Sequence, residues 1–201
     1  MKLRLDHLAI CATDLASGTA WAQKHLGVPL LPGGQHVRFG THNTLLGLAD
    51  GIYLEVIAPD PEAAPFAGPR WFDLDRFSGP PRLGNWICAS DDIAAAPAKA
   101  GTPIALTRGD LAWQIAVPED GSLPDDGGYP TLIEWGDCAH PATRLPNSGV
   151  SLCSLEVHHP QANALGAEMA ASLLDPRVTF HTSTSAALHA TFDTPSGRCR
   201  L

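Results

Sequence analysis

The chain has 201 residues, of which 44% are hydrophobic and 17% are charged, and its formal net charge is −8. This composition is typical of a globular protein with a substantial core, and it excludes a disordered chain. Lysine and arginine residues are scattered singly, so no surface is predicted that would neutralise phosphates. We therefore expect neither nucleic acid nor a membrane as a partner.

The N-terminal residues and the cysteines bear on where the protein works. Residues 1–7 place charges where a signal peptide needs an apolar run, and no stretch reaches the roughly 20 apolar residues that span a bilayer. The five cysteines are odd in number and include no CxxC pair, which argues against a disulfide framework. We expect a soluble, cytoplasmic protein.

Residues 1–60 predict a β-α-β-β-β unit. Residues 3–11 have the pattern of a strand that enters the core as it proceeds. Asp14 and Gly27 bracket an amphipathic helix over residues 15–26. Three short strands are expected after this helix, at residues 36–39, 43–48 and 52–57.

A second copy of the unit is predicted over residues 83–145, after a proline-rich connector at 61–82. Ile87-Cys88-Ala89-Ser90-Asp91 echoes Ile10-Cys11-Ala12-Thr13-Asp14, and Leu132-Ile133-Glu134 echoes Tyr53-Leu54-Glu55. Such a repeat indicates a duplicated module. Its strands are expected near residues 83–89, 104–107, 111–117 and 131–135, with a helix before Gly101 that Pro97 shortens or kinks.

A third, partial β-α-β-β unit is predicted over residues 146–201. Its elements are expected to be a strand at 150–157, a helix at 161–174, and strands at 178–182 and 187–192. The fold class is therefore α+β. Tandem βαβββ units form a curved mixed sheet around a small-molecule pocket, and the partial unit supports it.

Glu55 and His7 are the first candidates for chemistry. Glu55 lies in the middle of an apolar strand, where a buried carboxylate costs several kcal/mol unless a cation or hydrogen-bond donors meet it. Arg38 or backbone groups could be that partner, which is the structural alternative. His7 lies where its strand enters the core, and the first and fourth strands of one unit can face the same hollow.

Glu134 occupies the matching place in the repeated sequence, so we expect it to face the same hollow, although a rim carboxylate in water is the alternative. Two carboxylates and an imidazole form a workable first shell for zinc, manganese, iron or nickel. The sequence thus predicts His7, Glu55 and Glu134 as metal ligands. A glutamate with a raised pKa, Glu55 or Glu134, would serve as the proton shuttle.

The chain resembles the glyoxalase-like domain family of the vicinal oxygen chelate superfamily. The resemblance rests on residues 40–46, on residues 53–61, and on Trp135-Gly136-Asp137 through His140-Pro141. It implies a metal at the mouth of two curved sheets that chelates adjacent oxygens of a substrate. The ligand positions it implies map onto His7, Glu55, Asn85 and Glu134, and Asn85 departs from the family's usual residues.

Two functions and a plainer alternative follow. The first is a metal-dependent lyase, isomerase or dioxygenase that acts on a small oxygenated metabolite. The second is a metal-free binding or sequestering protein of the bleomycin-resistance type. The third is an interaction domain with a vestigial pocket. The sequence does not fix the oligomeric state, and a homodimer is left open. The residues expected to line the pocket are Asn43, Tyr53, Trp86, Trp113 and Trp135.

Overall fold

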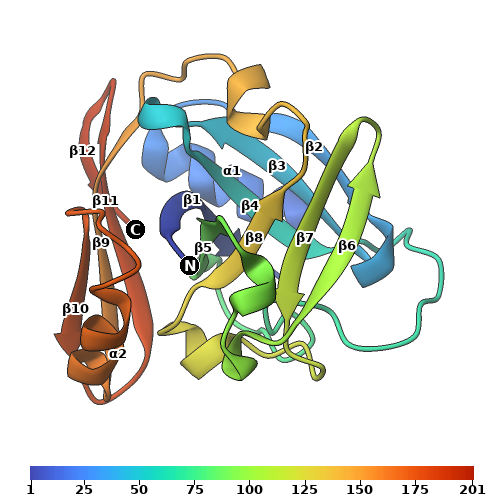
Figure 1. Cartoon of the computed structure of the whole chain (residues 1–201). Coiled ribbons are helices and arrows are strands. Elements are labelled where there is room, and N and C mark those ends of the chain that lie inside the picture. Colours follow the sequence, from blue (N-terminus) through green and yellow to red (C-terminus); the bar gives the residue numbers. More distant parts are fainter.

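Two β-sheets, one of eight strands and one of four, organise the chain in this computed structural model, which describes residues 1–201 (Figure 1). The strands are β1 (Leu3–Cys11), β2 (Leu31–His36), β3 (Thr41–Gly47), β4 (Tyr53–Pro59), β5 (Arg82–Ser90), β6 (Thr102–Arg108), β7 (Leu111–Val117), β8 (Thr131–Trp135), β9 (Ser151–His159), β10 (Val178–Thr182), β11 (Ala187–Thr194) and β12 (Gly197–Arg200). The two α-helices are α1 (Leu15–Leu26) and α2 (Ala162–Met169). The predicted α+β class is confirmed.

The large sheet has the strand order β2-β3-β4-β1-β5-β8-β7-β6 and is curled. Each half repeats one pattern, because β1 runs parallel to β4 and β5 runs parallel to β8. The halves meet where β1 and β5 pair in antiparallel fashion, with His7 opposite Ile87 and Ala9 opposite Asn85. This pairing relates the two units by an approximate two-fold axis.

The helix α1 begins and ends where the sequence predicts. The Asp14 side chain accepts a hydrogen bond from the backbone N–H of Ser17 at 2.8 Å, and Gly27 ends the helix in the left-handed region at φ 71°. An aspartate N-cap and a glycine after the last turn satisfy backbone groups that a helix leaves unpaired.

The first predicted strand after α1 is misplaced. Residues Val37–Phe39 form a 3₁₀ turn, and β2 instead covers the Pro32-Gly33-Gly34 segment. Proline and glycine weaken a central strand, but β2 lies at the edge of the sheet, where the backbone N–H that Pro32 lacks is not needed for pairing.

The second predicted helix is absent as an α-helix. Two 3₁₀ turns, Ile93–Ala95 and Ala98–Ala100, replace it on either side of Pro97, whose ψ of 149° is extended. Proline therefore divides the segment, as its lack of a backbone N–H requires. In the C-terminal part, α2 is shorter than expected, and the unpredicted strand β12 follows the turn at 195–196.

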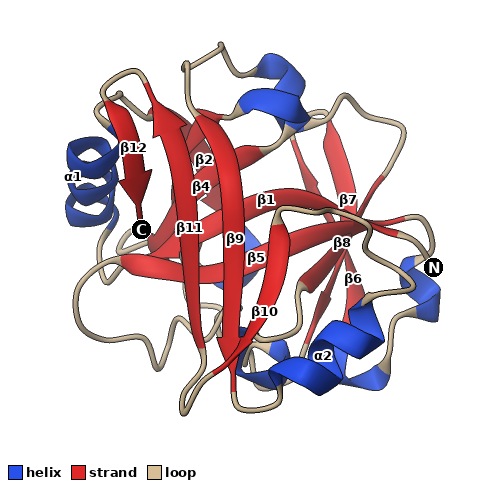
Figure 2. Ribbon diagram, turned by 90° about the vertical axis from the view of Figure 1, so that its left-hand side faces the viewer, coloured by secondary structure: helices blue, strands red, loops and turns tan.

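The small sheet, in the order β10-β9-β11-β12, crosses β1 and β5 steeply (Figure 2). Its topology differs from that of the first two units, because β9 pairs in parallel with β10, the strand directly after the helix. Leu155, Val157 and Phe192 from this sheet share one core with Leu8 and Trp86 of the large sheet. The other face of the large sheet has a separate, smaller core and holds the candidate site. Neither helix is long and apolar enough to cross a bilayer.

Candidate functional site

A bulge in β1 brings two neighbouring polar side chains together. The register against β5 shifts between Leu5 and His7, and Asp6 Oδ1 lies 2.6 Å from His7 Nδ1. Bulges redirect side chains in this way and recur next to active sites. The contact fixes the imidazole so that Nε2 points away from Asp6.

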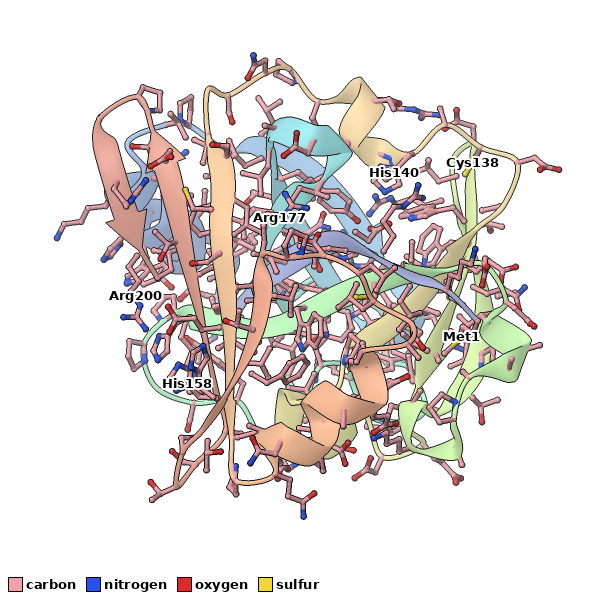
Figure 3. All side chains as sticks on the ribbon, turned by 60° about the vertical axis from the view of Figure 1, so that its left-hand side comes forward. Met1, Cys138, His140, His158, Arg177 and Arg200 are labelled. Atoms are coloured by element: carbon pink, nitrogen blue, oxygen red, sulfur yellow. The ribbon has the colours of Figure 1, made fainter.

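Asp6 is a buried carboxylate with partners from three parts of the chain. Besides His7, its Oδ2 accepts a hydrogen bond from Trp135 Nε1 at 2.9 Å and lies 3.0 Å from His140 Nε2. Burial alone would raise the pKa of Asp6, but the hydrogen bonds from His140 and His7 lower it. Figure 3 places His140 in the loop after β8, beside Cys138 and far along the chain from Asp6.

Glu55 lies on the other side of the His7 ring. Its Oε1 is 3.6 Å from His7 Nε2, and its Oε2 accepts a hydrogen bond from Asn43 Nδ2 at 2.8 Å. Tyr53 stacks on the imidazole, with the ring centroids 4.3 Å apart. The Asp6, His7 and Glu55 side chains are all at most 5% exposed.

These neighbours set the charges. Burial would lower the pKa of His7, but the hydrogen bond to Asp6 and the charges of Asp6 and Glu55 raise it to about 9. Burial would raise the pKa of Glu55, but His7 and Asn43 lower it, so the raised pKa that was expected for a glutamate proton shuttle is not found at Glu55. At neutral pH an imidazolium therefore stands between two carboxylates, and Glu55 is ionised.

A cavity of about 30 Å³ opens at His7 and Glu55. Four of the five predicted pocket residues line it: Asn43, Tyr53, Trp113 and Trp135. Trp86 does not, because it points to the opposite face of the sheet, donates a hydrogen bond from Nε1 to the Gly127 carbonyl, and is fully buried. The remaining lining residues are His36, Leu45, Trp71, Phe72, Arg108, Ile115, Ile133 and Pro141.

The second unit carries a neutral version of this pair. In the β1–β5 pairing His7 lies opposite Ile87 and Ala9 lies opposite Asn85, so the two-fold axis exchanges His7 with Asn85 and Ala9 with Ile87. The parallel partner of Ala9 on β4 is Glu55, and the parallel partner of Ile87 on β8 is Thr131. Thr131, rather than Glu134, is therefore the counterpart of Glu55. Asn85 Nδ2 donates to Thr131 Oγ1 at 2.9 Å, and Asn85 Oδ1 accepts from the backbone N–H of Trp86.

Glu134 does not reach the cavity, contrary to the expectation that two glutamates converge. Ile133 and Trp135 face the cavity, so Glu134 between them points to the other side of the strand. There its Oε2 accepts a hydrogen bond of 2.7 Å from the backbone N–H of Ile93, at the start of a 3₁₀ turn. The carboxylate caps this turn.

The donors present do not fit the four-ligand metal centre that the sequence resemblance implies. His7 Nε2 and Glu55 Oε1 converge, but Asn85 and Thr131 bind each other and Glu134 lies on the opposite face. No group of three or more histidine, cysteine, aspartate or glutamate side chains is arranged to hold an ion. Catalytic zinc sites usually have three protein ligands. Only His7 and Glu55 converge in this cavity, because the two ring nitrogens of His36 contact Thr41 and Arg108.

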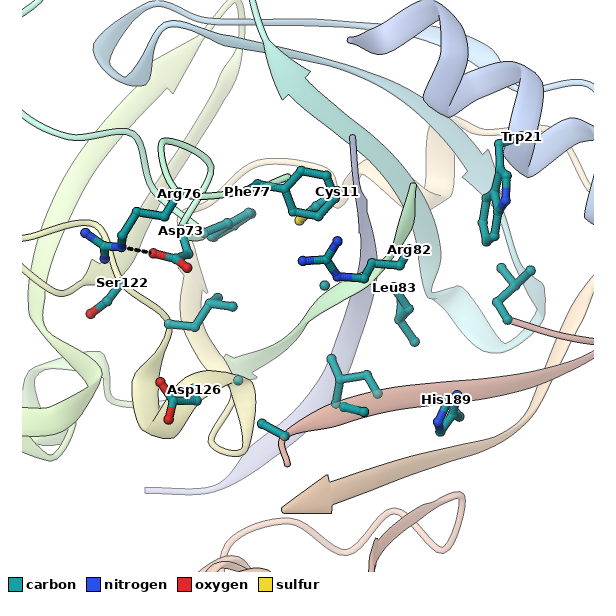
Figure 4. A pocket seen from close by; sticks show the side chains of 18 residues that line it. Cys11, Trp21, Asp73, Arg76, Phe77, Arg82, Leu83, Ser122, Asp126 and His189 are labelled. Atoms are coloured by element: carbon teal, nitrogen blue, oxygen red, sulfur yellow. Dashed lines mark hydrogen bonds and ion pairs between the residues drawn. The ribbon is translucent and has the colours of Figure 1, made fainter. Parts of the chain in front are cut away.

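A larger cavity of about 470 Å³ lies elsewhere, between the start of β5 and the small sheet (Figure 4). Phe72 lines both cavities and separates them. Arg76 lines this space but is bound to Asp73, and Arg82 lies over the Phe77 ring. None of the buried Asp6, His7 and Glu55 groups lines it, so the candidate chemistry belongs to the smaller cavity.

Several residues of the site escaped the sequence analysis. Asp6 adjoins the predicted His7, and its acidic side chain in a strand was the available signal. Thr131 and His140 depend on register and loop path, which short motifs do not encode. Trp71 and Phe72 come from the proline-rich connector, whose aromatic residues were the only indication that it covers the sheet.

Comparisons with known proteins find a matching family and similar solved structures. Residues 5–173 match the family described as "Glyoxalase-like domain". A hypothetical protein from Staphylococcus aureus has a similar structure, with a TM-score of 0.64 at 15% identity, over 92% of this chain and 88% of that one. Methylmalonyl-CoA epimerase from Mycobacterium tuberculosis aligns with a TM-score of 0.44 at 18% identity, over 69% of this chain and 91% of that one. No curated protein matches the sequence.

Proposed function

The chain belongs to the glyoxalase-like domain family, and we propose that it is an isomerase or lyase that moves a proton on a small oxygenated metabolite. The observation that carries this proposal is the buried pair of His7 and Glu55, with Nε2 and Oε1 3.6 Å apart at the wall of a cavity. The distance between Nε2 and Oε1 is too long for a direct hydrogen bond. Both atoms therefore remain available to a substrate oxygen or carbon that lies beside them.

Glu55 has the properties of the base. It is ionised, because its pKa is lowered, and the hydrogen bond from Asn43 to Oε2 leaves Oε1 free toward the cavity. In the proposed step a C–H bond next to a substrate carbonyl breaks. The proton passes to Glu55 Oε1, and the electron pair moves onto the carbonyl oxygen as an enolate.

His7 has the properties of the acid that stabilises this enolate. Its imidazolium form persists at neutral pH because the pKa is raised to about 9, so Nε2 can donate a hydrogen bond to the developing oxyanion. Asp6 orients the ring and balances its charge. The enolate then takes the proton back from Glu55 at another carbon, which gives an isomer. Alternatively it expels a leaving group, which takes up the proton from Glu55, and the reaction is then a lyase reaction.

The surroundings strengthen the interactions on which this chemistry depends. Tyr53, Trp113 and Trp135 enclose the pair, and a cavity of about 30 Å³ admits only the reacting end of a metabolite. In such a site with little water, fixed charges act more strongly than they do in solution.

Proton exchange with deuterated water tests the proposal. Small 2-oxo and 2-hydroxy carbonyl compounds are incubated with the protein in D₂O, and loss of the C–H signal is followed by ¹H NMR. We expect exchange of at least one compound, and a decrease of roughly 100-fold or more in Glu55→Gln and His7→Gln, because proton-transfer groups contribute on the order of 10² to 10⁴. Glu134→Gln is the matched control, since that carboxylate lies on the opposite face.

Two results would overturn the proposal. One is an exchange rate in Glu55→Gln equal to that of the unchanged protein, and the other is an equal loss in Glu134→Gln. The same assay with a chelator, and then with added zinc, manganese, iron or nickel, tests the metal-dependent form. Activity that disappears with the chelator and returns with one metal would assign the chemistry to that ion.

Ligand binding without catalysis is the second candidate. The aromatic lining favours it, because Trp71, Trp113 and Trp135 offer faces on which a flat apolar ligand can stack. A ligand panel read by tryptophan fluorescence and by melting temperature tests this function. A compound that binds tightly but undergoes no exchange would support it.

A further inference from the structure

The two edges of the large sheet approach each other and leave a groove between them. The edge strands are β2 and β6, and the groove of about 410 Å³ lies between the turn that follows β2 and the length of β6. A Cβ atom on Gly34 would lie 3.0 Å from the Arg108 side chain, so the edges are in close contact at this point. The groove is lined by Gln35, His36, Val37, Arg38, Phe39, Ala105, Leu106, Thr107, Arg108 and Trp113.

The charge of this groove is opposite to that of the whole protein. The chain has a net charge of −8, yet the lining contains two arginines and no aspartate or glutamate. Neither Arg38 nor Arg108 forms an ion pair, whereas most of the other arginines do. Guanidinium groups favour carboxylates and phosphates, which they bind through parallel hydrogen bonds.

Arg108 connects the groove to the inner cavity. Together with His36 and Trp113 it lines both spaces. Its Nη1 lies 3.1 Å from His36 Nε2, and its guanidinium carbon is 6.0 Å from the centre of the Trp113 ring. Burial lowers the pKa of His36 to about 4, and the charge of Arg108 adds to this shift. His36 is therefore neutral at pH 7 and adds no charge of its own to that of Arg108.

Five of the ten lining residues are apolar. Val37 is 75% exposed, and Phe39 and Leu106 lie beside it. A ligand that matches these features carries one anionic group and an apolar body.

We propose that this groove binds the anionic group, a carboxylate or a phosphate, of an amphipathic small molecule, with Arg108 as its main contact and Arg38 as the second. The further step, that the opposite end of the same molecule reaches His7 and Glu55, rests on the proposed function. Anion binding by the groove does not depend on that step and is measured separately.

Isothermal titration at low ionic strength tests the groove with three probes of similar size: 3-phenylpropionate, phenyl phosphate and the neutral 3-phenylpropanamide. We expect at least one anion to bind roughly tenfold or more tightly than the amide, and the tighter anion distinguishes a carboxylate site from a phosphate site. Arg108→Gln should weaken anion binding by roughly tenfold or more and leave amide binding unchanged. Arg108→Lys should restore part of it. Higher salt should also weaken it.

Arg4→Gln is the matched control, because Arg4 is exposed, lies outside the groove and forms no ion pair. Arg38→Gln provides a second variant should Arg108→Gln lower the melting temperature. Absence of anion binding, equal affinity for the amide, or equal losses in Arg108→Gln and Arg4→Gln would each overturn the proposal. If Glu55→Gln abolishes proton exchange yet retains anion binding, both proposals are supported. If no compound exchanges but anions bind through Arg108, only the proposed function fails.

Discussion

His7 illustrates, at the scale of single residues, how a buried group acquires its charge from its neighbours. An isolated imidazole buried to this extent would be neutral, because burial lowers its pKa. The Asp6 carboxylate at 2.6 Å and Glu55 on the opposite side reverse this outcome and raise the pKa to about 9. The folded protein therefore binds a proton more tightly than the unfolded chain, whose histidines titrate near 6.5.

This difference predicts how stability depends on pH. The contribution of protonated His7 is fully present below about pH 6.5, and it is lost as the pH rises through about 9. We expect the free energy of unfolding to fall by on the order of 1–3 kcal/mol across this range. Urea unfolding at a series of pH values measures it. His7→Gln should abolish most of the decline, and a decline of unchanged size in that variant would contradict the assignment.

The sequence was a good guide to single residues in the first unit and a poor one in the second. His7 and Glu55 could be predicted because a polar side chain inside an apolar strand needs a reason to be there. Glu134 could not be placed correctly. The sequence similarity between residues 53–55 and 132–134 aligns Glu55 with Glu134, whereas the strand pairing matches Glu55 with Thr131. Side chains alternate between faces along a strand, so an error of an odd number of residues moves a residue to the wrong face.

At the scale of elements, the contact of α1 with the large sheet depends on a small residue. Gly18 is buried in the helix, and a Cβ atom there would lie 2.6 Å from Ala12 Cβ and 2.7 Å from Val56 Cγ1. Gly166 in α2 is the opposite case, since its added Cβ would find its nearest neighbour, Phe180, at 3.4 Å.

Replacing each glycine with alanine should change stability in opposite directions. Alanine favours a helix over glycine by about 1 kcal/mol, so Gly166→Ala should stabilise the protein by up to that amount. In Gly18→Ala the same gain is outweighed by overpacking, which costs about 1–3 kcal/mol. Thermal unfolding followed by circular dichroism compares the two variants. Stabilisation by Gly18→Ala would show that α1 can move away from the sheet.

The elements that could be predicted are those with local signals. Asp14 and Gly27 fix the ends of α1 within the sequence itself. The strand β2 contains Pro32, Gly33 and Gly34, which indicate a turn, and only its position at the sheet edge permits a strand. This position is a property of the tertiary fold, and local patterns do not report it.

At the scale of the whole molecule, the two sheets share a single core. Phe192 on β11 is fully buried in the same cluster as Leu8 of β1 and Trp86 of β5. The backbone N–H of Leu3 also donates to the carbonyl of Ser172, which joins β1 to the C-terminal part. The small sheet is therefore a structural part of the molecule that carries the site, although it contributes no residue to the inner cavity.

This arrangement predicts that the two sheets unfold together. Phe192→Ala should lower the free energy of unfolding by about 3–5 kcal/mol, the usual cost of removing a buried phenylalanine. All five tryptophans lie between residues 21 and 135, outside the small sheet. Their fluorescence reports the large sheet and the segments that cover it, and Trp86, whose ring lies 6.2 Å from that of Phe180 on β10, also reports the contact with the small sheet. Far-ultraviolet circular dichroism reports both sheets.

If the core is cooperative, both signals should shift to the same lower denaturant concentration in Phe192→Ala, with a single transition. Thr191→Ala is the control, because Thr191 adjoins Phe192 but points away from the core and should change stability far less. Two steps in circular dichroism, with most of the fluorescence change confined to the second, would mean that the small sheet unfolds alone. The site would then not depend on the small sheet for its stability, because β1 and β4 would hold His7 and Glu55 in place without it.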